Sequence, residues 1–275
     1  MNFSFFYTKG GSAYIRGEQM ANYIGGKKNP TSGFENDICI YVKIVPPDNH
    51  PKHSYADVDD SPKLANHLKT HPELGVIAIS ETIKDYLSNL LNRKDIIFIP
   101  HPHVNFERWI RPVREIKTVG IIGSKTSFQY PIELLRKELK KIGLELKYKE
   151  NYWNTYKSTP DREMRLKICD FHKEIDIQVV WRPRVPYKKM IPFANPNKLG
   201  NASAFGIPTV SYPEPNYIRE WNGCFIKTNT IERLIRACKE LKDNPNYYDY
   251  YSKRTLRRAE DYHIENIVKL YKNLK

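Results

Sequence analysis

Short apolar stretches alternate with amphipathic ones along the first hundred residues. β-Branched and aromatic residues dominate the apolar stretches, and these predict strands at 2–9, 37–46, 75–80 and 95–100. Apolar residues near helical spacing predict helices at 12–24, 61–74 and 81–93. Ser61 and Ser80 occupy N-cap positions, and Pro62 suits a first helical turn. Strands that alternate with helices are typical of a parallel sheet with helical crossovers.

The alternation stops at residues 101–116, which carry two prolines and no steady period, and it then begins again. Strands are predicted at 117–124, 144–150, 176–181, 208–213 and 224–228. Helices are predicted at 131–143, 162–175, 197–203 and 230–244, followed by a long basic helical tail. We therefore expect an α/β protein with two Rossmann-like domains facing across a cleft, one over residues 1–112 and one over 113–255. Ligands of this class bind in such a cleft, where the loops after the strands meet.

The charge is uneven along the chain. The whole sequence has 45 Lys and Arg against 31 Asp and Glu, whereas residues 1–112 have about 13 against about 12. The remaining residues therefore carry nearly all of the excess of +14. The positive electrostatic field of this excess favours an anionic partner, which could be nucleotide phosphates, nucleic acid or an anionic membrane.

The cysteines and the apolar segments indicate the cellular compartment in which the protein is expected. Cys39, Cys169, Cys224 and Cys238 form no CxxC pair, which disfavours a zinc site or a disulfide framework and fits a reducing cytosol. No stretch approaches the roughly 18 to 20 uncharged apolar residues of a membrane span, and no basic region precedes the first apolar run. We expect a cytoplasmic protein without a transmembrane segment.

One short predicted helix begins with unusually polar residues. Asn197, Lys198 and Asn201 lie in its first turns, and Gly200 and Gly206 permit a close approach of backbone to ligand. The first N–H groups of a helix are unpaired and carry partial positive charge, so a diphosphate could bind there beside Lys198. A capped helix without a ligand is the plainer alternative.

Two sets of segments share a pattern with a known family. In the second half the segment is NKLGNASAFGIPTV followed by EPNYIREWNGCFIK, and in the first half the segments are SAYIRGEQMANYI, YADVDDS, GVIAISETIKDYL and IIFIPHPHVNFERW. The resemblance is to GT-B glycosyltransferases, near the retaining group 1 enzymes that include glycogen and sucrose synthase-like members, whose donor-binding segment is similar to the one in the second half. It implies a UDP- or GDP-sugar donor and a C-terminal helix, 256–275, that packs back on the first domain. Asn201 or Ser203 stands where the group has its ribose-binding Glu, which leaves the nucleotide and the anomeric outcome open.

In the resembled fold the loop at Gly123, Ser124 and Lys125 faces the donor phosphates. The sequence GSKT lacks the upstream glycine spacing of a P-loop, which argues against an NTPase.

Two further pairs of charged residues are donor-site candidates. Arg182 and Arg184 follow a predicted strand and would lie at the same edge, although a solvated basic loop is an equal alternative. Glu214 and Glu220 are candidates for binding sugar or ribose hydroxyls. Glu220 fits the family position better because Gly223 follows it.

Acceptor-side candidates lie at the first strand–helix turn. Gly10 and Gly11 would admit a substrate close to the backbone, and Arg16 could hold an anionic acceptor or the departing phosphate. A surface arginine is the alternative for Arg16.

Catalytic candidates come from two further segments. Asp57 and Asp59 match a DxD metal motif, but their place before a capped helix favours an acidic helix start, from which either could act as a base. His101 and His103 flank Pro102 and would line the cleft, with His101 the catalytic candidate. No third ligand accompanies the two histidines, so no metal site is expected.

The resemblance and the charge predict a glycosyltransferase that moves a sugar from a nucleotide sugar to an acceptor hydroxyl. The acceptor could be a surface glycan or a lipid-linked saccharide, with the basic tail and its tyrosines resting on anionic lipid at the inner face of the membrane. Basic charge with interleaved aromatics also suits DNA, so a glycosyltransferase of modified bases is an alternative. A non-catalytic sugar-nucleotide or nucleic-acid binding protein on the same fold is another.

Overall fold

The computed structural model describes residues 2–8, 10–123, 128–150, 161–183 and 195–275. Their contacts form two compact units. Among the described residues, unit 1 comprises the chain up to Pro102 together with Asn195 and Ile264–Lys275, and unit 2 comprises the rest. The boundaries expected at 112 and 255 stay predictions, and residues 103–116 have their contacts within unit 2.

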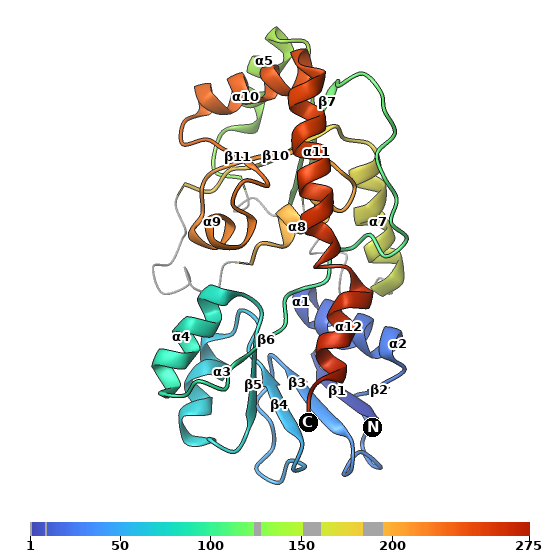
Figure 1. Cartoon of the computed structure of the whole chain (residues 1–275), viewed down its shortest axis with the longest axis vertical. Helices are drawn as coiled ribbons and strands as arrows, with labels where there is room; N and C mark the ends of the chain where they lie inside the picture. The colour runs from blue at the N-terminus through green and yellow to red at the C-terminus, as the bar shows by residue number, and fades with distance from the viewer. Residues whose placement is uncertain (1, 9, 124–127, 151–160, 184–194) are drawn as a thin grey trace. The chain divides into compact units, whose positions relative to one another are not determined.

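Unit 1 contains a parallel sheet with the strand order β2-β1-β3-β4-β5-β6 (Figure 1). Its strands are β1 (Phe3–Tyr7), β2 (Lys27–Lys28), β3 (Ile38–Val42), β4 (Ser54–Asp57), β5 (Gly75–Ala78) and β6 (Ile97–Phe98). Its helices are α1 (Gly11–Ala13), α2 (Met20–Ile24), α3 (Pro62–His67), α4 (Glu81–Leu91) and α12 (Ile264–Lys272). A π-helical stretch, Tyr14–Gln19, joins α1 to α2, and a short 3-10 turn, Leu68–Thr70, follows α3.

The expected caps of two helices are confirmed. The Ser61 hydroxyl accepts a hydrogen bond from the N–H of Leu64, and the Ser80 hydroxyl accepts one from the N–H of Ile83. Each bond satisfies one of the unpaired donors at a helix start, which fixes where α3 and α4 begin. Both starts follow strands of the sheet and so set the loops at its carboxyl edge.

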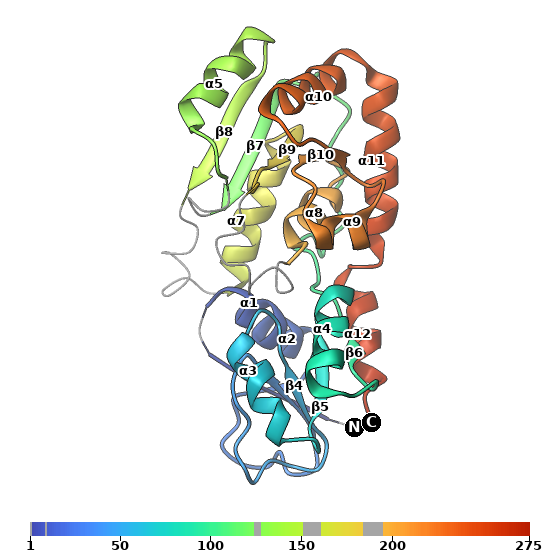
Figure 2. The ribbon, with the colours of Figure 1, turned by 90° about the vertical axis from the view of Figure 1, so that its left-hand side faces the viewer.

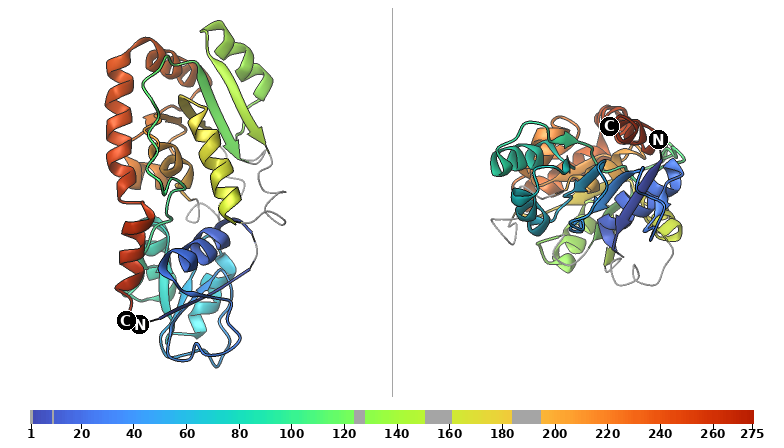
Figure 3. Two further views of the ribbon diagram at one scale, coloured as in Figure 1. Left: turned by 90° about the vertical axis from the view of Figure 1, so that its right-hand side faces the viewer. Right: turned by 90° about the horizontal axis from the view of Figure 1, so that it is seen from below.

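The last helix belongs to unit 1, as the sequence led us to expect. α12 packs against α2, and Tyr271 of α12 is fully buried against Phe5 of β1, with ring centroids 5.8 Å apart. The start of β1 and the end of α12 lie next to each other in every view (Figures 1 to 3). The end of the described chain is thereby tied to the first sheet.

Unit 2 contains a second parallel sheet with the order β11-β10-β9-β7-β8. Its strands are β7 (Thr118–Gly123), β8 (Glu145–Glu150), β9 (Ile177–Val180), β10 (Thr209–Ser211) and β11 (Ile226–Lys227). Its helices are α5 (Ile132–Lys141), α7 (Asp161–Lys173), α8 (Asn197–Ser203), α9 (Pro215–Trp221), α10 (Ile231–Asp243) and α11 (Pro245–Glu260). Figure 2 shows α5 beside β8 and α10 beside α11.

Both faces of this sheet are covered. Ile121 and Val179 pack into one apolar cluster with side chains of α5 and α10, whereas Ile122 and Val180 pack into another with side chains of α7, α8 and α9. Successive residues of a strand point to opposite faces, so a continuous apolar run is what two covered faces require. The carboxyl edge of the sheet is left for polar residues.

Candidate functional site

Three charged residues meet at the carboxyl edge of the unit 2 sheet. Arg182 follows β9, Glu214 follows β10, and Lys198 lies in the first turn of α8. Arg182 Nε donates to Glu214 Oε1 over 2.8 Å, and its second nitrogen donates to Glu214 Oε2 over 2.6 Å and to the Tyr217 hydroxyl over 3.2 Å. The Lys198 carbonyl accepts a hydrogen bond of 2.6 Å from the Gln178 side chain, which anchors α8 to β9. We refer to Arg182, Lys198 and Glu214, three of the residues expected from the sequence to bind the donor, as the donor-site cluster.

This cluster carries more positive than negative charge. Burial, and after it the neighbouring Arg182, lower the pKa of Lys198 to about 8 against the opposing effect of Glu214. Burial also opposes the charge of Arg182, but Tyr217 and Glu214 hold its pKa above the ordinary value. Two cations thus share one carboxylate, so an anionic group bound here would relieve the repulsion between them.

The other donor-side candidates are placed differently. The Asn201 side-chain oxygen accepts the N–H of Val104 over 3.1 Å, so it holds the segment after residue 102. Glu220 is buried, and its Oε2 accepts the Tyr262 hydroxyl over 3.1 Å. Asn197 is half-buried at the start of α8, and Gly123 ends β7 with a φ of 139°. Ser124, Lys125 and Arg184 lie outside the described residues.

In unit 1, Arg16 and Asp57 form a fully buried ion pair. Arg16 Nε donates to Asp57 Oδ2 over 2.6 Å, both side chains are 0% exposed, and a second Arg16 nitrogen donates to the Pro100 carbonyl over 3.1 Å. The Tyr271 hydroxyl donates to the same carboxylate oxygen over 3.2 Å. Burial raises the pKa of Asp57 despite the facing guanidinium. Arg16 thus lies inside the unit beside Asp57, not at its surface.

A second polar pair lies at the same edge of this sheet. His101 Nε2 lies 2.9 Å from Asp59 Oδ1, and Lys43 Nζ lies 3.8 Å from Asp59 Oδ2. Burial alone would raise the pKa of Asp59, but His101 and Lys43 bring it down to about 2. Lys43 also contacts the Ser12 hydroxyl over 3.1 Å. The pair can exchange a proton with a bound hydroxyl group.

The backbone around these residues is unusual. Asp59 and Lys43 have φ values of 46° and 58°, a left-handed conformation that costs energy for residues other than glycine. Gly10 has a φ of 118° and an added Cβ there would meet nothing within 4 Å, so glycine is required by conformation and not by crowding. Residues with positive φ in three loops at one edge are typical of a functional site.

Four buried polar atoms in this region have no hydrogen-bond partner among the described residues. They are Arg16 Nη2, Asp57 Oδ1, Asp59 Oδ2 and His101 Nδ1. Buried polar groups are nearly always hydrogen-bonded, so such a cluster is a place where water or ligand groups complete the bonding. We refer to Arg16, Asp57, Asp59 and His101 as the acceptor-side cluster.

The structure therefore brings together the acceptor candidate Arg16 with the catalytic candidates Asp57, Asp59 and His101 in unit 1. It brings together three donor-side candidates in unit 2, and it leaves Asn201 and Glu220 outside both clusters. Sequence reasoning missed Lys43, Tyr217 and Tyr271. Lys43 directly follows a buried strand, a position that could have pointed to it. Tyr217 and Tyr271 reach their sites from helices whose packing no local pattern reveals.

His103 is separate from His101. It lies in unit 2, buried beside His263 with ring centroids 5.3 Å apart, and burial lowers its pKa to about 3. Over the described ranges, no group of three or more His, Cys, Asp or Glu side chains is arranged to hold a metal ion. Nor does any helix in those ranges have the length and apolar character to cross a membrane.

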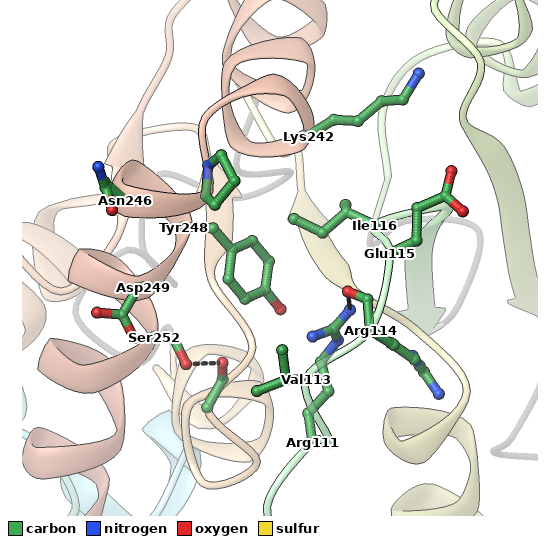
Figure 4. Close-up of a pocket in the computed structure, with 12 residues that line it drawn as sticks. Arg111, Val113, Arg114, Glu115, Ile116, Lys242, Asn246, Tyr248, Asp249 and Ser252 are labelled. Carbon is green, nitrogen blue, oxygen red and sulfur yellow. Dashed lines mark hydrogen bonds between the residues drawn. The ribbon is translucent and has the colours of Figure 1, made fainter.

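A cavity of about 550 Å³ lies elsewhere in unit 2, between α11 and the segment before β7 (Figure 4). Arg111 lines it, but its guanidinium bonds Asp176 and stacks on Tyr248 at 5.0 Å. The Ser252 hydroxyl donates to the Gly206 carbonyl over 2.6 Å. These polar groups already have partners, so this cavity is a weaker candidate for an anionic ligand than the donor-site cluster.

Two units with parallel sheets, each with polar residues at the carboxyl edge, define the class: the chain has the GT-B fold of nucleotide-sugar glycosyltransferases. TarM of S. aureus, crystallised as a point mutant with Fondaparinux, alpha-GlcNAc-glycerol and UDP, is similar with a TM-score of 0.54 and 14% identity, covering 86% of this chain and 55% of its own. HepE of Anabaena, crystallised with UDP and glucose, gives a TM-score of 0.55 and 8% identity over 99% and 98% of the two chains. WaaB, a lipopolysaccharide outer core galactosyltransferase in its apo form, gives a TM-score of 0.52 and 13% identity, covering 100% of this chain and 99% of its own. This chain thus spans about half the length of TarM but nearly the whole length of HepE and WaaB.

Sequence comparison adds nothing to the structural likeness. No protein-family model matches the chain, and no curated protein matches it. The likeness therefore shows the fold.

Proposed function

We propose that the chain is a glycosyltransferase that moves a sugar from a nucleotide-diphosphate donor to an acceptor hydroxyl. The observation that carries the proposal is the donor-site cluster, in which Arg182 and Lys198 lie close enough for their charges to interact and Glu214 supplies one carboxylate, bonded to Arg182. A diphosphate supplies the negative charge that this pair lacks. The carboxyl edge of a parallel sheet is also where ligands of doubly wound domains bind.

The donor we propose is a UDP-sugar, with a GDP-sugar as the alternative. UDP is named in the structures of TarM and HepE, which share the fold. Asn201 stands near the position of the ribose-binding Glu of the resembled group, so the base and ribose contacts are not carried over.

The chemistry follows from charge placement. Negative charge grows on the leaving diphosphate as the sugar departs, and Arg182 and Lys198 are held in place to stabilise it. In the acceptor-side cluster, Asp59 and His101 share a hydrogen bond of 2.9 Å, and this pair would take the proton of the attacking hydroxyl. Arg16 and Asp57 would hold the residues around Asp59 and His101 in position.

The acceptor we propose is a surface glycan or a lipid-linked saccharide, modified at the cytoplasmic side. The likeness to WaaB, which is named as a lipopolysaccharide outer core galactosyltransferase, supports this class.

The test is a screen of UDP- and GDP-sugars for release of nucleoside diphosphate, with and without oligosaccharide acceptors. Lys198→Ala should abolish the release, while Lys140→Ala, on the exposed face of α5, should leave it intact. Binding of a nucleotide sugar without any release, with every acceptor tried, would instead identify a non-catalytic binding protein.

A further inference from the structure

Glu214 occupies the N-cap position of α9, but its side chain does not cap the helix. No cap hydrogen bond involves its side chain, and both of its carboxylate oxygens accept instead from the Arg182 guanidinium. The residue is 2% exposed. Its carboxylate is therefore committed to an arginine on the neighbouring strand's loop.

We propose that Glu214 is a positioning residue that orients Arg182 toward the donor diphosphate and does not itself bind the ribose hydroxyls of the donor. This proposal rests on the proposed function and names the role of one residue in the same site. It differs from the role expected from the sequence, in which Glu214 binds sugar or ribose hydroxyls.

The geometry of the pair supports a positioning role. A guanidinium and a carboxylate joined by two parallel hydrogen bonds have a fixed mutual orientation, which a single contact does not provide. The Tyr217 hydroxyl contacts the same guanidinium nitrogen from α9, at 3.2 Å, and Tyr217 is itself fully buried. Arg182 bonds Glu214 through Nε and one terminal nitrogen, and its other terminal nitrogen donates to no described residue. That nitrogen is available to a phosphate oxygen.

Burial argues against direct binding of ribose. A carboxylate that takes a ribose diol must present its oxygens to the ligand, whereas the Glu214 side chain is 2% exposed and the Arg182 side chain is 22% exposed. The guanidinium is thus the more accessible member of the pair. A ligand that reaches the edge of the sheet meets Arg182 first.

Glu214 also acts on Lys198 through charge. Burial and then Arg182 lower the pKa of Lys198, Glu214 raises it, and together they leave it at about 8. Replacing the carboxylate by an uncharged amide should therefore lower the pKa of Lys198 further. Anion binding that depends on the ammonium would then be lost at a lower pH.

The experiment measures affinities by calorimetry for inorganic pyrophosphate, for UDP and GDP, and for their 2′-deoxy counterparts. The variants are Glu214→Gln, Arg182→Gln and the double variant, with Lys140→Ala, on the exposed face of α5, as the control that should leave the affinities unchanged. Thermal unfolding of each free variant checks that it folds. Glu214→Asp keeps the charge with a shorter reach, and serves in its place if Glu214→Gln fails to fold.

The expected result is that Glu214→Gln weakens pyrophosphate and the nucleoside diphosphates alike, by about tenfold or more, which is the change expected from a lost charge-assisted contact. The ratio of ribo to 2′-deoxy affinity should not change. In the Arg182→Gln background, Glu214→Gln should cost little more, because both act through one group. The pH at which pyrophosphate binding is lost should also fall in Glu214→Gln and stay near its original value in Glu214→Asp.

The opposite pattern would overturn the proposal. If Glu214→Gln leaves pyrophosphate binding unchanged and removes the preference for ribo over 2′-deoxy nucleotides, then Glu214 binds ribose, and the donor site itself still stands. If the unaltered chain binds neither pyrophosphate nor any nucleoside diphosphate, the proposed function is wrong and this inference is wrong with it.

Discussion

Breaking the Arg16–Asp57 ion pair should destabilise unit 1 severely. Both side chains are 0% exposed and 2.6 Å apart, so Arg16→Met leaves a buried carboxylate whose remaining described contact is the Tyr271 hydroxyl. Removing one partner of a buried pair typically costs about 3–5 kcal/mol. Asp57→Asn in the same background removes the stranded charge, so the double variant should recover about 2 kcal/mol relative to the sum of the single changes.

The assay is urea unfolding followed by far-UV circular dichroism. Lys27→Met is the matched control, because Lys27 pairs with Asp37 in the same unit but is 42% exposed, and such pairs are worth less than about 1 kcal/mol. All four tryptophans lie between residues 103 and 263, so tryptophan fluorescence reports on unit 2 and should change less than the dichroism signal. A loss below about 1 kcal/mol for Arg16→Met, with additive costs in the double variant, would refute the reasoning.

Three further outcomes follow, two from the clusters and one from the backbone at Gly10. Binding of pyrophosphate should be strong below the Lys198 pKa of about 8 and should weaken as the pH rises through that value, because the ammonium loses its charge. If calorimetry shows the same affinity from about pH 7 to about pH 9.5, Lys198 does not contact the anion. The Asp59 pKa of about 2 in the folded chain lies below the ordinary 3.8, so the carboxylate contributes stability above about pH 4 that is lost as pH falls toward 2. Asp59→Asn should therefore make unfolding less acid-dependent, by about 2 kcal/mol across that range, and equal acid dependence in both proteins would contradict this. Gly10→Ala should cost about 1 kcal/mol through backbone strain alone, since its Cβ meets no neighbour, and an unchanged melting temperature would show that the loop can adjust.

Local signals in the sequence predicted much of the fold. Ser61 and Ser80 mark helix starts by a mechanism confined to a few residues, and the apolar runs mark strands buried on both faces. The four-residue strand Ser54–Asp57 was not predicted, because its two ends are polar and it is too short to show a period. Helix Pro215–Trp221 was missed because its seven residues mix buried and exposed polar side chains.

Individual residues of the two clusters could be selected from the sequence, but the contacts between them could not be predicted. Residues that follow parallel strands share one edge of their sheet, which is why Arg182 could be selected from the sequence, whereas Asp57 was selected from its DxD spacing and Glu214 from the resemblance. The contacts of Asp57 could not be predicted, since Arg16 lies 41 residues from it and Tyr271 lies 214 residues from it. The packing of whole helices sets such contacts.

The central claim is that Arg182 and Lys198 bind the diphosphate of a nucleotide sugar, and calorimetric titration with UDP and GDP tests it most directly. The account predicts that the unaltered chain binds one of them, that Lys198→Ala weakens this binding by at least about tenfold without unfolding the chain, and that Lys140→Ala leaves it unchanged. Tight nucleotide binding that Lys198→Ala and Arg182→Gln both leave intact would place the donor elsewhere and contradict the account.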